Sequence, residues 1–153
     1  MKQISKLLEE RTAMKAEELG TLVHQLKSSG TDSQLVEVKE SVGKMPASIV
    51  ETVSAFANGS GGTIVLGLSE RNGFAPAEGF DARRIADALS QACSDKLTPP
   101  VRAGIEIMEH QGANIVLAEV DEVLPRDKPC YVTERGMYKA AFVRTFDGDR
   151  KLS

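Results

Sequence analysis

The stretch SAFANGSGGTIVLGL, residues 54–68, decides the fold of this 153-residue chain. Residues 63–68 form an unbroken apolar run, which is typical of a strand buried on both faces. The residues before the run complete a predicted helix over 45–58 that opens with Pro46 and carries one apolar stripe. The stripe consists of Ile49, Val50, Val53, Phe56 and Ala57. A helix that returns through a short glycine turn to a buried strand predicts an α/β domain.

The glycine-rich turn 59–62 precedes a strand, whereas a phosphate-binding loop follows a strand and precedes a helix. We therefore interpret this turn as a tight connection that uses the positive φ available to glycine. Asn58 is expected to end the helix, because asparagine tolerates the left-handed conformation found there. Gly43-Lys44 lacks the flanking residues of a Walker A loop, so nucleotide binding has little support.

Helix and strand patterns continue on both sides of this stretch. Residues 12–27 place apolar side chains at helical spacing behind Thr12, a candidate N-cap, and Asp81 is positioned to cap a helix that runs to about Cys93. Two of the strand-like segments are separated by a short loop and predict an antiparallel hairpin. The predicted strands are 35–39, 63–68, 101–108, 114–120, 130–133 and 138–144. We expect a mixed sheet with helices packed on it.

Composition restricts the class of protein. Hydrophobic residues make up 41% and charged residues 27% of the chain, which suits one folded domain over residues 30–153 behind an N-terminal helical segment, 1–29. No apolar run approaches the roughly 18–20 residues of a membrane span. Cys93 and Cys130 have no metal-ligand spacing. We expect a cytoplasmic protein without a membrane partner, and a natural chain that continues beyond Ser153.

Charge is distributed unevenly although the net charge is only −3. Residues 46–125 carry five basic and eleven acidic groups, whereas residues 126–151 carry seven basic and four acidic groups. Such asymmetry predicts a basic face that could contact a phosphate backbone, and an ordinary solvated surface is the alternative. The candidate phosphate contacts are Lys39, Lys44, Arg126, Lys128, Arg135, Lys139, Arg144 and Arg150.

A second group of candidates is acidic and consists of Asp32, Glu37 and Glu70, with Lys39 beside them. Carboxylates that converge hold Mg²⁺ or Mn²⁺, and a lysine can steady an attacking water or a phosphate. Five extended residues span about 16 Å, so the chain has to bend after Asp32 for this site to form. In the alternative interpretation Asp32 is a turn residue, and Glu37 and Lys39 are the solvent side of a strand.

These residues carry a resemblance to a known family. The segments LVEVKES at 35–41, SAFAN at 54–58 and GGTIVLGL at 61–68, followed by Pro129-Cys130-Tyr131 and a Tyr138-to-Arg144 strand, resemble the Schlafen AlbA-type domain. The match covers residues 30–150. The family, also called divergent AAA-4, is described as DNA-binding, and its bacterial members stand at the N-terminus of longer proteins regarded as transcriptional regulators or ATP-binding proteins.

The resemblance also implies a metal site in part of the family. Schlafen nucleases cut transfer and ribosomal RNA, and three acidic residues bind their metal. Carried over by motif position, these residues are Asp32, Glu37 and Glu70. The family generally has Glu at the first position and Asp at the third, and Val38 replaces its usual Phe, so this chain departs from the nuclease pattern.

The sequence therefore predicts a nucleic-acid-binding domain, with DNA favoured over RNA, in a transcriptional regulator. No cofactor is expected for a binding domain. The alternative function is a metal-dependent endoribonuclease with Asp32, Glu37 and Glu70 as ligands and catalytic groups, Lys39 as support, and Mg²⁺ or Mn²⁺ as cofactor. A third alternative is an ATP-binding or assembly module. A homodimer is a further expectation.

Overall fold

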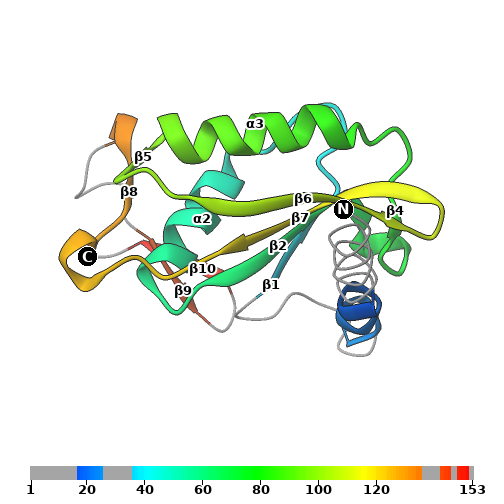
Figure 1. Ribbon diagram of the computed structural model, residues 1–153, viewed down its shortest axis with the longest axis horizontal. Coiled ribbons are helices and arrows are strands. Elements are labelled where there is room, and N and C mark those ends of the chain that lie inside the picture. The colour runs from blue at the N-terminus through cyan, green and yellow to red at the C-terminus, as the bar shows by residue number, and fades with distance from the viewer. Residues whose placement is uncertain (1–16, 26–35, 136–141, 146–147, 152–153) are drawn as a thin grey trace, which may run out of the picture.

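A four-stranded mixed sheet forms the centre of the domain, in the order β1-β2-β7-β6 (Figure 1). The computed structural model describes residues 17–25, 36–135, 142–145 and 148–151. β1 (Val36–Lys39) runs parallel to β2 (Gly62–Leu66), and β2 pairs antiparallel with β7 (Ala113–Val120). β6 (Ala103–His110) completes a hairpin with β7 and forms one edge of the sheet. The predicted mixed sheet is confirmed.

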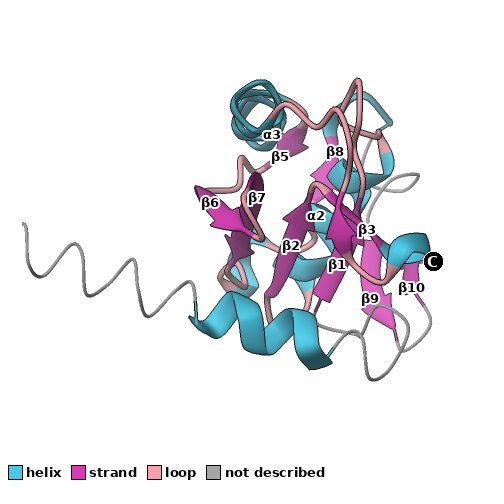
Figure 2. Ribbon diagram, turned by 90° about the vertical axis from the view of Figure 1, so that its right-hand side faces the viewer, coloured by secondary structure: helices cyan, strands magenta, loops and turns pink. Residues whose placement is uncertain are grey.

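Helices cover both faces of this sheet. α2 (Ser48–Asn58) connects β1 to β2 and lies with α3 (Ala82–Asp95) on one face, while the helical segment 17–25 lies on the other (Figure 2). Segment 17–25 contributes Leu19 and Val23, which are buried against Val36 and Val38 of β1. The alternation in β1 thus directs its valines toward segment 17–25 and its other side chains toward the α2 side.

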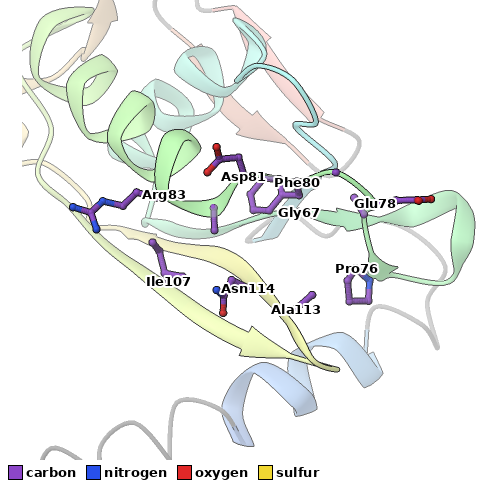
Figure 3. Close-up of a pocket in the computed structure, with 12 residues that line it drawn as sticks. Gly67, Pro76, Glu78, Phe80, Asp81, Arg83, Ile107, Ala113 and Asn114 are labelled. Atoms are coloured by element: carbon purple, nitrogen blue, oxygen red, sulfur yellow. The ribbon is translucent and has the colours of Figure 1, made fainter.

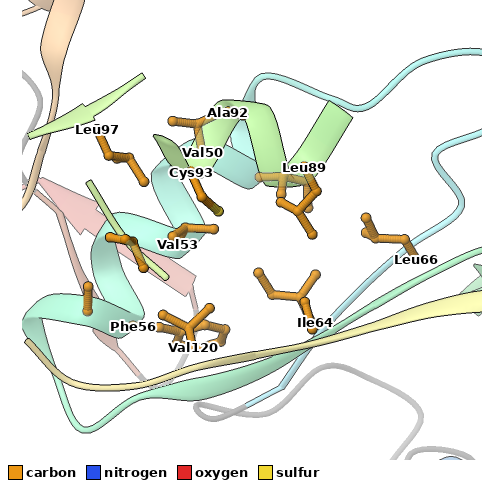
Figure 4. Packing of buried hydrophobic residues seen from close by; sticks show 14 of the residues in the cluster. Val50, Val53, Phe56, Ile64, Leu66, Leu89, Ala92, Cys93, Leu97 and Val120 are labelled. Carbon is orange, nitrogen blue, oxygen red and sulfur yellow. The ribbon is translucent and has the colours of Figure 1, made fainter. Parts of the chain in front are cut away.

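The larger core lies between α2, α3 and the sheet (Figure 4). Phe56 of α2 and Ile85 and Leu89 of α3 are almost fully buried, as are Ile64 and Leu66 of β2. The apolar stripe predicted for α2 is therefore confirmed, and so is the burial of the strand that follows the glycine turn. Burial also raises the pKa of the Cys93 thiol to about 11 and that of the Cys130 thiol to about 12, so both thiols stay protonated at neutral pH.

Short elements surround the sheet. A strand pair and a 3₁₀ turn follow β2, a second strand pair joins the end of α3 to the later chain, and a hairpin packs along α2. These elements are β3 (Leu68–Ser69), η1 (Glu70–Asn72), β4 (Ala75–Pro76), β5 (Leu97–Thr98), η2 (Pro125–Asp127), β8 (Tyr131–Val132), η3 (Thr133–Arg135), β9 (Phe142–Thr145) and β10 (Gly148–Lys151). Among the described residues, none of the helices is long and apolar enough to cross a membrane.

Several local predictions are confirmed and several bounds differ. The Asp81 carboxylate accepts a hydrogen bond from the Arg84 N–H at 3.2 Å and caps α3, as expected. The β6–β7 hairpin turns through Gln111 and Gly112, both with positive φ. The strand predicted over 63–68 ends at Leu66, because Gly67 has a φ of 104° and redirects the chain into β3.

Other differences concern the ends of α2 and the last strands. α2 begins at Ser48 rather than Met45. Asn58 is the last residue of α2 and is not left-handed; the left-handed residue of the turn is Gly61, with a φ of 84°. The strand predicted over 130–133 is limited to β8, and β9 runs to Thr145 and pairs with β10, which the sequence patterns did not reveal. Tyr138 lies outside the described residues.

The SAFAN segment has a structural role. Ser54 Oγ donates to the Cys130 carbonyl at 2.7 Å, and Asn58 Nδ2 donates to the same carbonyl at 2.9 Å. The Cys130 N–H in turn donates to Asn58 Oδ1 at 2.6 Å. A Cβ placed on Gly62 would lie 2.5 Å from the Phe56 ring. The segment therefore attaches a distant part of the chain to α2 and brings β2 close to it.

Candidate nucleic-acid interface

The carboxyl end of β1 holds an ion pair on the α2 side of the sheet. Glu37 opposes Ile64 in the register, so it shares the face that packs under α2. Its side chain is 7% exposed, and Oε1 lies 3.2 Å from Lys39 Nζ, whose side chain is 42% exposed. The interpretation of Glu37 as a solvent-facing residue is wrong, because β1 is buried on both faces at this position. Lys39 balances the charge of a carboxylate that water scarcely reaches.

Glu40 joins this end of β1 to the chain after β2. The Gly67 N–H donates to the Lys39 carbonyl at 2.9 Å, which places β3 beside Glu40. Ser69 Oγ then donates to Glu40 Oε1 at 2.5 Å, and Arg71 Nη2 lies 3.5 Å from the same oxygen. The hydrogen bond from Ser69, assisted by the Arg71 charge, holds the pKa of Glu40 below its ordinary value. Sequence reasoning missed Glu40, because its two partners lie about thirty residues away in the chain.

The structure describes two of the three carboxylates predicted to bind metal. Glu37 is buried, whereas Glu70 is exposed at the start of η1. Asp32 lies outside the described residues. In the described part of the chain, no group of three His, Cys, Asp or Glu side chains is arranged to hold a metal ion. The metal site therefore stays a prediction that depends on Asp32.

Three basic residues lie on segments that adjoin the carboxyl ends of β1 and β2. Lys39 is on β1, Lys44 is exposed on the loop between β1 and α2, and Arg71 is exposed on η1. Ser41 lies in the same loop with a φ of 52° and is 5% exposed, and its hydroxyl has no hydrogen-bond partner among the residues that the structure describes. The carboxyl ends of parallel strands, next to the start of a helix, are where sheets of this kind bind anionic ligands.

The remaining basic candidates do not all join this group. Arg126 is exposed on η2, and Lys128 Nζ lies 2.6 Å from Glu122 Oε1. Both are next to the carboxyl end of α2, because the Val123 N–H donates to the Ala57 carbonyl at 2.9 Å. The eleven residues of α2 span about 16 Å, and the loop with Lys44 is at its other end. Arg126 and Lys128 thus lie at the opposite end of α2 from the loop with Lys44, and a single basic cluster of the C-terminal candidates stays a prediction.

The β9–β10 hairpin lies along α2, on the side of its first turns. Thr52 Oγ1 donates to Asp149 Oδ2 at 2.7 Å. In the hairpin register Asp149 opposes Arg144, and Arg150 opposes Val143, so the two candidate arginines belong to the part of the hairpin next to Thr52. Arg135 ends η3. Lys139 lies outside the described residues.

An open groove of about 800 Å³ lies beyond the end of β2 (Figure 3). Gly67 and Phe80 lie on one side, and Ile107 and Asn114 of the β6–β7 hairpin lie on the other. Its charged lining residues are Glu78, Asp81 and Arg83, and Arg83 Nε lies 3.8 Å from an Asp87 carboxylate oxygen. A groove with more carboxylates than cations does not suit a polyanion.

The comparisons with known proteins agree with this fold. The N-terminal domain of a Nitrosomonas europaea protein related to the ATP-dependent DNA helicase RecG superposes with a TM-score of 0.66 at 24% identity, over 87% of this chain and 92% of that domain. The DIP2311 protein of Corynebacterium diphtheriae superposes with a TM-score of 0.56 at 19% identity, over 90% of this chain but only 27% of its own length. At these identities the likeness concerns the fold.

No curated protein sequence matches the chain. A family model does, and the match extends over residues 32–153, from before β1 to the last residue. It thus includes the buried Glu37, the SAFAN segment with its bonds to Cys130, and Gly62, which packs against the Phe56 ring. The chain belongs to the Schlafen AlbA_2 family.

Proposed function

We propose that this domain binds nucleic acid, with DNA as the natural ligand, at the carboxyl end of β1 and β2. The observation that carries the proposal is that Lys39, Lys44 and Arg71 stand on β1, on the loop that leads from β1 to α2, and on η1, which the Glu40–Arg71 ion pair joins to the end of β1. Phosphate contacts supply most of the affinity of sequence-independent binding, and cations from separate segments can follow a backbone. The family, and the relation of one structural neighbour to a DNA helicase, support a ligand of this class.

The ion pairs at this end suit reversible contact with phosphate. Glu37 and Glu40 hold Lys39 and Arg71 in place without burying either cation. Lys44 is exposed and forms no ion pair with any described residue. A phosphate oxygen would compete with a carboxylate for Lys39 and for Arg71, and it could contact Lys44 without displacing a carboxylate of the described residues.

The chain contains no Trp, five Phe and two Tyr, so stacking on bases has few side chains to use. We therefore propose binding with weak sequence preference. Action within a cytoplasmic bacterial transcriptional regulator, as a homodimer, belongs to the same proposal; the two free and buried cysteines fit a reducing compartment.

The test compares two double variants with the same change in charge. Lys44→Glu with Arg71→Glu lowers the net charge at the proposed interface by four units, and Lys96→Glu with Arg102→Glu makes the same change at exposed positions elsewhere. Affinity for short duplex DNA, single-stranded DNA and transfer RNA is measured over a salt series. We expect the first variant to lose at least tenfold in duplex affinity, and the second to lose much less. Equal losses would show that only net charge matters and would refute the interface.

The hairpin makes a separate contribution in this proposal. Each phosphate contact contributes roughly 0.9 to the slope of log affinity against log salt for duplex DNA. Replacing Arg144 and Arg150 with Ala should flatten this slope by about one to two units. An unchanged slope would remove the hairpin from the interface and leave the end of β1 as the only candidate. Tighter binding to transfer RNA than to duplex DNA would show that RNA is the ligand.

Cleavage is the second candidate function. The burial of Glu37 beside Lys39 favours it, because acidic residues are rarely buried and need a partner when they are. A metal-dependent endoribonuclease would use Asp32, Glu37 and Glu70 with Mg²⁺ or Mn²⁺. The same titrations with added Mn²⁺ separate the two functions, since cleavage of transfer RNA that Glu37→Gln abolishes would establish the nuclease, and binding without turnover would establish the binding domain.

A further inference from the structure

β1 and β6 are the two edge strands of the sheet, and β6 is the longer. Among the described residues, no other strand pairs with the outer side of β6. β6 pairs with β7 along all eight of its residues, from Ala103 to His110. It contains no proline, and its other side is the edge of the sheet in both views (Figures 1 and 2). Such an edge presents backbone N–H and C=O groups to which an extended segment can add.

Side chains on this edge add an apolar contact. Ile107 is 43% exposed, which is unusual for a large apolar side chain in this domain. It points into the groove described above, opposite Phe80 (Figure 3). Ile105, on the same face of β6, packs at the border of the core under α3. A strand added beside β6 would therefore cover Ile107 and extend into the groove with alternate side chains.

The charge of the edge determines which kind of segment fits. β6 carries Glu106 and Glu109 and no lysine or arginine. The groove contributes Glu78 and Asp81. Residues 46–125, which include all of these, carry eleven acidic and five basic groups. Lysine or arginine opposite a carboxylate stabilises a cross-strand pair, whereas a second carboxylate destabilises it.

A second copy of β6 fits this edge poorly. In an antiparallel pair of strands, two opposed residues point to the same face of the sheet, whereas successive residues of one strand point to opposite faces. In a symmetric pair of β6 strands, the two-fold axis must therefore pass next to a residue that lies opposite its own copy. The registers that pair seven residues are centred on Glu106 and on Ile107. The first brings two Glu106 side chains together, and the second places Glu109 opposite Ile105. Neither places a cation opposite Glu106 or Glu109.

We propose that β6 and the adjoining groove form a docking site for an extended, basic segment of a partner protein, which adds to the sheet as an antiparallel strand. The residue pattern of that segment follows from the faces of β6. Basic residues oppose Glu109 and Glu106, and β-branched apolar residues oppose Ile107 and Ile105. Along the partner the order is basic, any residue, apolar, basic, apolar. The backbone supplies affinity and this pattern supplies specificity.

The test uses the synthetic peptide Ser-Lys-Thr-Val-Lys-Val-Ser, labelled with a fluorophore, and a scrambled peptide of the same composition, Ser-Lys-Lys-Val-Val-Thr-Ser. Anisotropy measures affinity, and amide hydrogen exchange followed by NMR locates the bound strand. We expect the patterned peptide to bind at least fivefold more tightly than the scrambled one. Bound peptide should slow the exchange of alternate amides in β6, and leave β1 unchanged.

Variants of the protein test the pattern itself. Glu106→Lys with Glu109→Lys should weaken binding of the patterned peptide by about tenfold, since each exposed pair contributes a few-fold and is here replaced by repulsion. The same variant should gain affinity for the peptide in which both lysines are glutamates. Glu134→Lys, an equal change in charge per residue on the exposed η3 turn, is the control and should change neither affinity by more than about twofold.

Two results would overturn the proposal. One is equal binding of patterned and scrambled peptides, which would indicate general attraction of cations to an acidic protein. The other is binding without protection of β6 amides, which would place the peptide elsewhere. Self-association through β6 is separately visible by sedimentation: a dimer that Glu109→Lys dissociates would make a second copy, rather than a basic segment, the occupant.

Discussion

The two edges of the sheet differ in the basic residues that accompany their carboxylates. At the carboxyl end of β1, Glu37 and Glu40 each lie beside a cation, Lys39 and Arg71. On β6, two glutamates occur in a strand that has no basic residue. A net charge of −3 describes neither edge. Our two proposals assign a phosphate ligand to the first edge and a basic partner to the second, and they are compatible because charge acts locally over about the Debye length, roughly 8–10 Å.

β2 lies between β1 and β7 and so connects the two edges of the sheet. A substitution that disturbs β2 should therefore have the largest effect on stability. Gly62→Val should destabilise the domain by about 3 kcal/mol, because the new side chain would overlap the Phe56 ring. Both edges should then lose their ligands together. Denaturant unfolding measures the change. Gly104→Val is the control, since the nearest atom to its Cβ is 4.0 Å away, and a loss as large as that of Gly62→Val would contradict the packing argument.

Asn58→Ala tests the attachment of the Cys130 segment, and with it the position of Arg126 and Lys128 near α2. The change removes the two hydrogen bonds between Asn58 and Cys130 and leaves the buried Cys130 N–H without its acceptor, so we expect a loss of about 2 kcal/mol in the free energy of unfolding. Thermal unfolding and calorimetry provide the measurement. Asn58→Asp keeps an acceptor for the Cys130 N–H and should retain part of the stability. Equal losses in the two variants would mean that the acceptor is unimportant.

Lys39→Met tests the ion pair at the β1 edge, because it leaves the buried Glu37 without the Lys39 cation. We expect a loss of about 1–2 kcal/mol, discounted because Lys39 is partly exposed, and a smaller loss for Glu37→Gln, which leaves no buried charge. Urea titration measures both. A larger loss for Glu37→Gln would mean that the carboxylate has a further essential partner. Mn²⁺ should leave the Tm of the unmodified protein unchanged if the domain only binds nucleic acid.

The smallest expected effect is an electrostatic one at Glu40. Ser69→Ala removes the hydrogen bond that is the main cause of the lowered pKa, so the pKa of Glu40 should rise toward its ordinary value of 4.5. Because the folded pKa lies below the unfolded one, this interaction stabilises the fold above about pH 4.5 and is lost as the pH falls through the lowered folded pKa. NMR titration of the Glu40 side chain measures the change. An unaltered titration would assign the lowered pKa to Arg71 instead.

Local patterns were sufficient for much of the fold. The Asp81 cap, the apolar stripes of α2 and α3, and the turn at Gln111 and Gly112 all follow from short-range rules of capping, periodicity and turn geometry. The resemblance to the family, expected over residues 30–150, is confirmed by the family match over residues 32–153. By contrast, the spacing of the basic candidates does not reveal that the chain before Arg126 lies beside the last turn of α2 while the β9–β10 hairpin contacts Thr52, because spacing along the chain does not determine which part of a helix a later segment reaches.

The sequence by itself thus determined the class of fold, the elements of the central sheet and the family, since each depends on residues that are neighbours in the chain. The tertiary structure decided the surroundings of the individual functional side chains. Glu37 became buried because β1 received cover on both faces, Glu40 met Ser69 because β3 turned back at Gly67, and Asn58 met Cys130 across 72 positions of sequence. Contacts of this kind arise only when distant segments pack, because the position of one segment against another is determined by the whole core and not by the residues that touch.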